Sequence, residues 1–234
     1  MTTGVFRDRM DAGRQLAARL ETYAGRPDVL VLALPRGGVP VGLAVAQALQ
    51  VPLDVFLVRK LGVPGHEELA MGAIATGDVV VLNEDVVREL GIPERVLTAV
   101  VAQERQELAR RDHLYRDGRP LPTIRDRTII LVDDGLATGA TMRAAAQAIR
   151  EQQPARLVIA VPVGARQTCE AFQAEADEVI CLITPTPFYA VGLWYDDFSP
   201  TSDQEVHAGL TEAAARPLAA PGGQAAPPAD TFAP

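Results

Sequence analysis

The chain has 234 residues, of which 48% are hydrophobic and 5% aromatic, and its formal net charge is −8. That length supports one α/β domain of ordinary size with a substantial core, and the acidic balance argues against a nucleic-acid partner. No secretory signal pattern and no apolar run long enough to span a bilayer is found, so we expect a cytoplasmic protein without a membrane partner.

Hydrophobic periodicity predicts an alternation of helices and strands along most of the chain. In chain order the expected elements are helix 8–22, strand 29–34, helix 39–49, strand 54–58, strand 79–82, helix 94–115, strand 128–132, helix 141–152, strand 157–163, helix 165–176 and strand 178–183. Alternation requires crossover connections, and continuously apolar strands fit a sheet covered on both faces. The predicted fold class is therefore α/β, with a mainly parallel sheet flanked by helices.

We predict a single domain over residues 1–215. Residues 216–234 are rich in Pro and Ala and have no apolar periodicity, so they are expected to form a disordered tail. Cys169 and Cys181 have neither metal-ligand spacing nor a disulfide framework, and both are interpreted as core or incidental residues.

The most informative segment runs from Ile130 to Thr141, where a buried strand is followed by Asp133-Asp134, small residues and a helix. Backbone N–H groups at a helix N-terminus bind phosphate, and the helix dipole favours the negative charge. Two carboxylates beside a phosphate cradle fit a ligand that carries hydroxyls next to its phosphate, such as a ribose, and they can face Mg²⁺ through water. The alternative interpretation is a turn with a helix cap.

This segment resembles the phosphoribosyl-pyrophosphate motif of type I phosphoribosyltransferases, and the resemblance extends over roughly residues 5–210. It implies that family's fold with a small hood, and a donor, 5-phosphoribosyl-1-pyrophosphate, bound with Mg²⁺. It assigns the ribose hydroxyls, an indirect metal contact and a catalytic part to Asp133 and Asp134. It assigns the 5-phosphate to Gly135, Ala137, Thr138, Gly139, Ala140 and Thr141. Hypoxanthine-type members carry another Asp where this chain has Ala137, so a base from that position is lacking.

Two further segments resemble the family's pyrophosphate-binding loops. In Pro35-Arg36-Gly37-Gly38, backbone N–H groups and the Arg36 guanidinium suit a diphosphate, and family members often hold a non-proline cis peptide there. The alternative is an ordinary turn with Arg36 in solvent. Arg59-Lys60 and the Gly/Pro-containing loop predicted after it resemble the mobile loop of adenine-type members, in which they neutralise the departing pyrophosphate. Lys60 is the only lysine among 22 basic residues, and its compact ammonium suits a phosphate oxygen.

The acceptor side is less defined. The resemblance implies that Glu67 or Glu68, on the predicted mobile loop, handles a purine proton. The alternative is that each is a solvated loop acid. Residues 184–205 resemble the base-binding hood of 6-oxopurine members, in which Phe188 or Tyr189 stacks on the base, the Val191 backbone reads an edge and Asp196 accepts from an exocyclic amine. The alternative is that these aromatics pack the hood onto the core. The lysine that reads a purine in such hoods has no counterpart in this chain. The adenine-type loops and the 6-oxopurine-type hood also point to different bases.

The charged helix 94–115 and the residues that follow it carry Arg105, Arg110, Arg111, Arg116 and Arg119. One interpretation is a solvated helix with ion pairs. The other is a dimer arm that brings Arg111 or Arg116 to a neighbour's pyrophosphate site. Because members of the resembled family are commonly dimers or tetramers, we expect a homodimer or higher homo-oligomer.

Two functions of different class remain open at this point. The first is an enzyme of nucleotide salvage that transfers the 5-phosphoribosyl group to a nitrogenous, purine-like base with Mg²⁺ and releases pyrophosphate. The second is a non-catalytic sensor that binds the same donor to control a partner. Retention of Arg36, Lys60 and the loop acids favours the enzyme, because a sensor needs only the 133–141 site.

Overall fold

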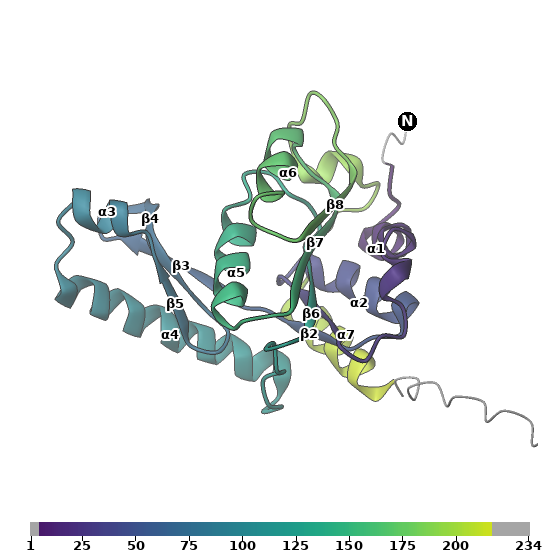
Figure 1. The fold of residues 1–234 in the computed structure, drawn as a ribbon, viewed down its shortest axis with the longest axis horizontal. Helices are drawn as coiled ribbons and strands as arrows, with labels where there is room; N and C mark the ends of the chain where they lie inside the picture. Colours follow the sequence, from purple (N-terminus) through teal and green to yellow (C-terminus); the bar gives the residue numbers. More distant parts are fainter. Residues whose placement is uncertain (1–4, 217–234) are drawn as a thin grey trace, which may run out of the picture.

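The computed structural model describes residues 5–216, and a parallel sheet of five strands lies at its centre (Figure 1). The strands, in the spatial order β2-β1-β6-β7-β8, are Leu53–Val55, Val29–Ala33, Thr128–Val132, Arg156–Val163 and Glu178–Ile183. Every neighbouring pair in this sheet is parallel. The predicted α/β fold with a mainly parallel sheet is confirmed. Apart from Arg216, the predicted tail 216–234 lies outside the described residues.

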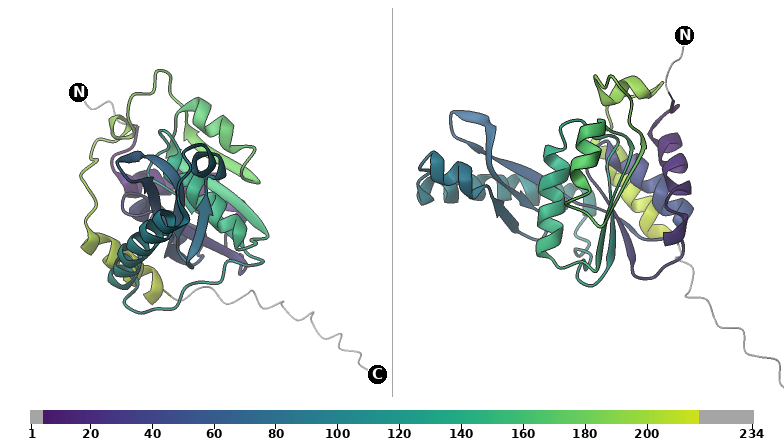
Figure 2. Two further views of the ribbon diagram at one scale, coloured as in Figure 1. Left: turned by 90° about the vertical axis from the view of Figure 1, so that its left-hand side faces the viewer. Right: turned by 45° about the horizontal axis from the view of Figure 1, so that its top comes forward.

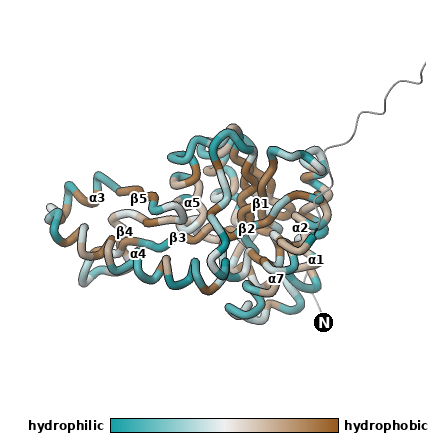
Figure 3. The backbone as a smooth tube through the Cα atoms, turned by 90° about the horizontal axis from the view of Figure 1, so that it is seen from below, coloured by the Kyte–Doolittle hydropathy of each residue, from teal (hydrophilic) through white to brown (hydrophobic). Residues whose placement is uncertain are grey.

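Helices cover both faces of this sheet because alternate residues of each strand point to opposite sides. On β1, Val29 and Val31 pack with α1 (Arg9–Ala18) and α2 (Gly38–Leu49). Leu30 and Leu32 pack on the opposite face with α5 (Ala140–Glu151) and α6 (Arg166–Phe172). Figure 2 shows helices on both sides of this sheet. Figure 3 shows hydrophobic residues concentrated along these central strands. The continuous apolar runs of the sequence therefore correspond to strands buried on both sides.

A second, smaller sheet projects from the domain together with two helices (Figures 1 and 2). We call this unit the arm. It contains the antiparallel strands β3 (Val58–Val63), β4 (His66–Ala75) and β5 (Val79–Leu82), with the helices α3 (Glu84–Glu89) and α4 (Glu94–Arg116). Leu61, Met71 and Ile74 are buried against Leu108 and Tyr115 of α4. The same cluster includes Ala33 of β1 and Val39 of α2, so the hydrophobic core of the arm is continuous with that of the parallel-sheet domain.

The expectation of a loop that follows Arg59-Lys60 and carries Glu67 and Glu68 is wrong. Val58–Val63 and His66–Ala75 pair as a hairpin, and the turn is confined to Pro64-Gly65, where Gly65 has a φ of 81°. Leu61 and Val63 are buried while Lys60 is exposed, which is the alternation of a half-buried strand. The predicted strand 54–58 also divides in two, because the chain leaves the parallel sheet after Val55.

Several helical boundaries differ from those expected. The helix predicted over 165–176 ends at Phe172, and the one predicted over 8–22 ends at Ala18 and is followed by a 3₁₀ turn, η1 (Glu21–Tyr23). Helix α7 (Asp203–Ala215) was not expected, although Ser202 and Glu205 form a reciprocal capping box at its start. Among residues 5–216, no helix is long and apolar enough to cross a membrane.

The two cysteines pack in or against the core, but the expectation that they form no disulfide is wrong. Cys169 of α6 and Cys181 of β8 form a disulfide across a sequence separation of 12. Helix α6 packs back on β8, and this places the two thiols together. Spacing along the sequence does not report this pairing, because it arises from a crossover connection in the fold.

Candidate functional site

The paired acids lie at the carboxyl end of β6, a strand whose residues are all buried. The Asp134 N–H donates a 2.8 Å hydrogen bond to Oδ1 of Asp133, which fixes the two acids relative to each other. Beyond them, the Leu136 N–H donates to the Val163 carbonyl at 2.8 Å and anchors the loop to the end of β7. Gly139, with a φ of 76°, precedes the first turn of α5. The strand, acids, loop and helix therefore occur in the predicted order.

The two carboxyl groups have an unfavourable electrostatic environment. Burial raises the pKa of Asp133 well above its ordinary range, and the neighbouring Asp134 raises it further. Burial also raises the pKa of Asp134, although the nearby Arg9 guanidinium opposes this. Buried like charges that face each other are stabilised by hydroxyl donors or a cation. The pair is thus suited to a ligand that brings hydroxyl groups with it.

The loop Pro35–Gly38 lies directly against these acids. A Cβ added at Gly38 would lie 2.9 Å from the Val132 carbonyl oxygen, and one added at Gly37 would lie 2.6 Å from Cγ of Asp134. Only glycine allows so close an approach. The Pro35–Arg36 peptide is cis, as the resemblance to the family's loop implies. We call the loops 35–38 and 133–141 together the donor cradle.

The Arg36 side chain of the donor cradle is half exposed. Its Nη1 atom lies 3.8 Å from Oδ1 of Asp203, at the start of α7. The same carboxyl oxygen accepts a 2.6 Å hydrogen bond from the Tyr115 hydroxyl of α4, and burial with this bond raises the pKa of Tyr115 to about 12. Arg36 therefore lies where α4 and α7 meet, with its guanidinium accessible to an anion.

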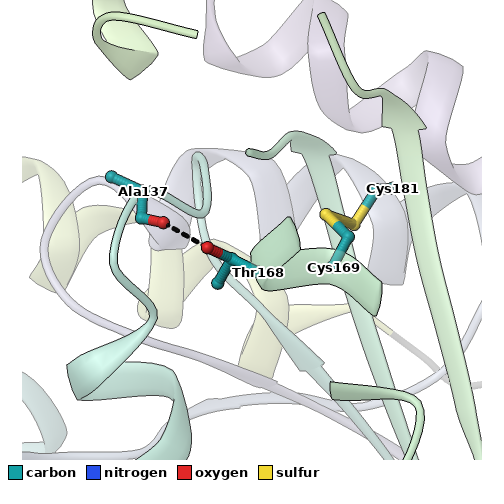
Figure 4. The surroundings of a disulfide bond; sticks show 4 residues. All are labelled: Ala137, Thr168, Cys169 and Cys181. Atoms are coloured by element: carbon teal, nitrogen blue, oxygen red, sulfur yellow. Dashed lines mark hydrogen bonds between the residues drawn. A yellow bond between two sulfur atoms is a disulfide. The ribbon is translucent and has the colours of Figure 1, made fainter. Parts of the chain in front are cut away.

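Helix α6 supports the phosphate-loop half of the donor cradle. The Thr168 hydroxyl donates a 2.8 Å hydrogen bond to the Ala137 carbonyl, next to the disulfide of Cys169 (Figure 4). A Cβ added at Gly139 would lie 2.7 Å from the Phe172 ring. Sequence reasoning missed Thr168, since no local pattern links α6 to the loop. The loop's path is therefore fixed from outside its own motif.

The predicted hood segment lies beside the acids, but its residues are placed unequally. Val191, in the 3₁₀ turn η2 (Val191–Trp194), lies against Gly135, where an added Cβ would be 2.6 Å from Val191 Cγ2. Phe188 is partly buried in an aromatic cluster with Phe6, as the packing alternative predicts. Tyr189 is 79% exposed and Asp196 is also exposed. Of these residues, Val191 is the one in contact with the acid loop.

Tyr195, which sequence reasoning did not single out, contacts the site more closely. Its hydroxyl donates a 2.5 Å hydrogen bond to the Asp134 carbonyl, and its ring packs between Phe6 and Phe198. Burial raises the pKa of this phenol, so it remains a neutral donor. Tyr195 therefore ties the hood segment to the acid loop.

The arm carries two of the cations predicted to bind pyrophosphate, and Arg59 is ion-paired with a residue of the arm itself. Nε of Arg59 donates to Oε2 of Glu104 at 2.7 Å, and the same guanidinium borders a small cleft with Pro35 and Thr141 of the donor cradle. Lys60 is exposed on β3 and borders a separate recess between that strand and α4. Glu67 and Glu68 lie in β4, and their side chains are outside the part of the chain that the structure describes.

The proposed delivery of Arg116 to a neighbour's site is wrong. Its side chain is fully buried, where it bonds to Asp54 at 2.9 Å, to the Val55 carbonyl at 2.6 Å and to Asp112. Arg111 pairs with Glu107 at 2.8 Å and borders the small cleft beside Thr141 of its own chain. Much of helix α4 carries ion pairs, as the alternative interpretation predicts.

Sequence reasoning also missed Arg9. Its Nε donates to Oδ2 of Asp134 at 2.8 Å, its Nη1 donates to the Ser199 carbonyl at 2.8 Å, and its guanidinium lies 3.9 Å from the centroid of the Phe198 ring. A signal was present, because Arg9 falls on the buried stripe of α1 that also includes Ala12, Gly13 and Leu16. An arginine on an apolar stripe needs a buried partner.

The acids fit an indirect metal contact better than a direct one. Among residues 5–66 and 69–216, no cluster of three or more His, Cys, Asp or Glu side chains is arranged to hold a metal ion. Mg²⁺ prefers six oxygen ligands and retains waters or takes substrate phosphates. Asp133 and Asp134 could therefore face such an ion only if water or a bound diphosphate completed its coordination.

Residues 7–197 match the family described as the phosphoribosyl transferase domain. Two Mycobacterium tuberculosis proteins, from strains CDC 1551 and H37Rv and provisionally named phosphoribosyl transferases, are each 50% identical over 209 residues, which is 89% of this chain and 47% of theirs. The chain thus spans about half the length of these relatives. The crystal structure of TT1426 from Thermus thermophilus is also similar, with 42% identity, a TM-score of 0.79, and coverage of 88% of this chain and 98% of that chain.

Proposed function

The chain belongs to the phosphoribosyl transferase family, and from this premise we propose that it transfers 5-phosphoribosyl from 5-phosphoribosyl-1-pyrophosphate to a purine-like base. Pyrophosphate is the other product. The observation that carries the proposal is the donor cradle itself: two carboxylates, a helix-opening loop and the Arg36 loop meet at one edge of a parallel sheet. Ligands of such sheets bind at the carboxyl ends of the strands.

Each half of the donor has a counterpart in the donor cradle. Asp133 and Asp134 accept hydrogen bonds from the ribose hydroxyls, and the backbone N–H groups of Gly135 and of Ala137 to Thr141 hold the 5-phosphate at the start of α5. The N–H groups of Arg36 and Gly37 and the Arg36 guanidinium face the diphosphate. Mg²⁺, when bound to the diphosphate, would supply further neutralisation of its charge.

The chemical step asks the chain mainly for electrostatic stabilisation. As the bond from the ribose to the pyrophosphate breaks, negative charge grows on the leaving group, and we assign its stabilisation to the cations Arg36, Arg59 and Lys60. Arg59 contributes only if its guanidinium exchanges the Glu104 carboxylate for a phosphate oxygen. Movement of the arm toward the donor cradle would exclude water from the reacting carbon.

For the acceptor we propose only a chemical class, a purine-like base. We propose that the base lies beside Val191, with Phe188 or Tyr189 and Asp196 completing its pocket, and that Glu67 or Glu68 handles its proton. A homo-oligomer in the cytoplasm is part of the same proposal.

A second function, a non-catalytic sensor of the donor, is favoured by one observation. The donor cradle is closely packed, whereas Tyr189 and Asp196, which are proposed to bind the acceptor, are exposed. The residues for donor binding are therefore assembled, and those for acceptor binding are dispersed. A protein that only reports donor concentration would need no more than this.

One experiment tests both functions. Donor binding is measured by calorimetry with Mg²⁺, and pyrophosphate release is measured over a panel of purine and pyrimidine bases. The variant Asp133→Asn/Asp134→Asn should lose donor binding, while Asp85→Asn, on exposed helix α3, should retain it. Tight binding without turnover on any base would support the sensor and exclude the enzyme. If the wild type does not bind the donor, both functions are excluded.

A further inference from the structure

Arg9 occupies a place where a charged side chain needs an explanation. Its residue is 9% exposed, yet it lies on the stripe of α1 that otherwise carries Ala12, Gly13 and Leu16. Burying a guanidinium costs several kcal/mol unless a partner compensates it. An apolar side chain could fill the same stripe without that cost. The contacts of the Arg9 side chain should therefore explain why an arginine occupies this position.

The contacts of Arg9 join three segments that are distant in sequence. From α1 it reaches Oδ2 of Asp134, 125 positions away, and the Ser199 carbonyl, 190 positions away. The Phe198 ring covers its guanidinium at 3.9 Å. A Cβ added at Gly37 would lie 3.2 Å from the Arg9 Nε atom, so the ion pair also abuts the Pro35–Gly38 loop. Arg9 therefore touches both loops of the donor cradle and the end of the hood segment.

The ion pair between Arg9 and Asp134 is well shielded from water. The exposed fractions of the two side chains are 10% and 16%, so solvent screens their attraction weakly. Arg9 acts against the burial that raises the pKa of both Asp133 and Asp134. The other ionisable groups that interact with the pair are Asp133 and Tyr195, which stays neutral, and the exposed acids Asp197 and Glu205, whose pKa values Arg9 helps to lower. Arg9 is thus in direct contact with Asp134 and acts on Asp133 through its charge.

The geometry leaves one oxygen of Asp134 for a ligand. Among the side chains that the structure describes, Arg9 is the one that donates to this carboxylate, and it engages Oδ2. A guanidinium that holds one oxygen at 2.8 Å limits rotation of the carboxylate and so fixes the direction of the other.

We propose that Arg9 is a positioning residue for donor binding, which orients Asp134 and supplies the positive charge that keeps the acid pair able to accept the ribose hydroxyls. This rests on the proposed function, because the ligand is the same donor. Through Phe198 and Ser199, the same guanidinium connects the hood segment to the acid that holds the ribose.

The test is a double-mutant cycle between Arg9 and Asp134, read as donor affinity by calorimetry with Mg²⁺ across a range of pH. Arg9→Met should weaken binding about 10- to 100-fold, the effect of removing a hydrogen bond to a charged group. The loss should grow as pH falls, because the acids then protonate more readily. In an Asp134→Asn background, Arg9→Met should weaken binding less than about threefold, since the two residues act through each other. Arg9→Lys should restore the pH dependence but only part of the affinity.

Matched controls separate positioning from folding. Arg7→Met removes a largely exposed arginine, ion-paired with Asp11, and should leave donor affinity unchanged. If Arg9→Met does not fold, Arg9→Gln takes its place in the cycle. An equal loss in the two backgrounds, or no loss in either, would overturn the proposal.

Failure of the proposed function would look different. If the wild type does not bind the donor, the Asp134 carboxyl can still be titrated by carbon NMR in the ligand-free protein. The pKa of Asp134 should then be higher in Arg9→Met than in the wild type. An unchanged pKa would overturn the role of Arg9, independently of the donor.

Discussion

The donor cradle and the arm both carry residues that resemble binding loops, but the fold uses them differently. In the donor cradle, Gly37 and Gly38 contact the acids so closely that no side chain fits between them. In the arm, Arg59 and Arg111 are held by Glu104 and Glu107, and Arg116 is buried. The course of a loop at the end of a buried parallel strand is set by that strand. A cation on the projecting arm instead pairs with a nearby carboxylate.

The largest expected effect concerns the arm and is one of stability. Arg116→Met should lower the free energy of unfolding by about 3–5 kcal/mol, because Asp54 loses the charge that compensates its burial. Urea denaturation measures this. Arg110→Met, on an exposed pair of the same helix, should change it by less than about 0.5 kcal/mol. Donor affinity per folded molecule should be unchanged in both, and a specific loss in Arg116→Met would return this arginine to the site.

The next effect concerns the donor cradle and is one of binding. Gly37→Ala should weaken donor affinity about 100-fold, as expected when a binding group is displaced by about 1 Å. The added Cβ would overlap the Asp134 carboxylate, whereas the backbone at Gly37, with φ −61° and ψ −32°, accepts alanine without strain. Calorimetry with Mg²⁺ measures the loss.

Gly209→Ala is the matched control for this variant. A Cβ at Gly209 in α7 would meet Val39 Cγ1 at 3.5 Å, an ordinary contact. Helix propensity predicts a small gain of stability there, up to about 1 kcal/mol, and no change in donor affinity. Wild-type affinity in Gly37→Ala would show that the two loops of the donor cradle do not cooperate in binding.

The same contrast explains what could be predicted from the sequence. Strands β5, β6 and β8 occupy the predicted residues, and the donor cradle follows its local motif, because a buried strand, small loop residues and a helix start are all encoded side by side. The cis peptide after Pro35 was implied by resemblance alone.

What could not be predicted depends on contacts between distant residues. Arg9 and Asp134 are 125 positions apart, and Tyr195 reaches Asp134 across 61. Strand β4 was missed because its Gly and Ala residues have weak strand preference, and pairing with β3 and β5 decides its conformation. The disulfide was missed for the same reason, since α6 and β8 meet only in the folded chain.

The two regions should also respond oppositely to pH. The pKa values of Asp133 and Asp134 are raised above the ordinary 3.8, so the folded state binds more protons than the unfolded one between that value and the raised ones. Their contribution to stability is therefore present at low pH and is lost as pH rises through this window. Donor affinity should rise over the same window, because ionised carboxylates accept hydrogen bonds better.

In the arm, hydrogen bonds from Arg110 and Arg111 lower the pKa of Glu107 from 4.5 to about 2. Its stabilisation is present above pH 4.5 and lost as pH falls toward about 2, although solvent exposure keeps it small. Urea unfolding of wild type, Asp133→Asn/Asp134→Asn and Glu107→Gln over this pH range isolates each slope by difference. Slopes of the same sign in the two regions would contradict the contrast.

The smallest expected effect tests whether Arg59 of the arm can bind the donor once its ion pair with Glu104 is removed. Glu104→Gln removes the carboxylate that competes with phosphate for Arg59, and should tighten donor or pyrophosphate binding by up to about fivefold, the value of one partly exposed ion pair. Asp78→Asn is the control, because it breaks the ion pair between Asp78 and Arg105. Arg105 lies on the same helix as Glu104 but away from the small cleft. Tighter binding in Glu104→Gln alone would show that Arg59 can reach the donor once released. Equal affinities would mean that the Arg59 guanidinium does not act on the pyrophosphate, and the leaving group would then depend on Arg36 and Lys60.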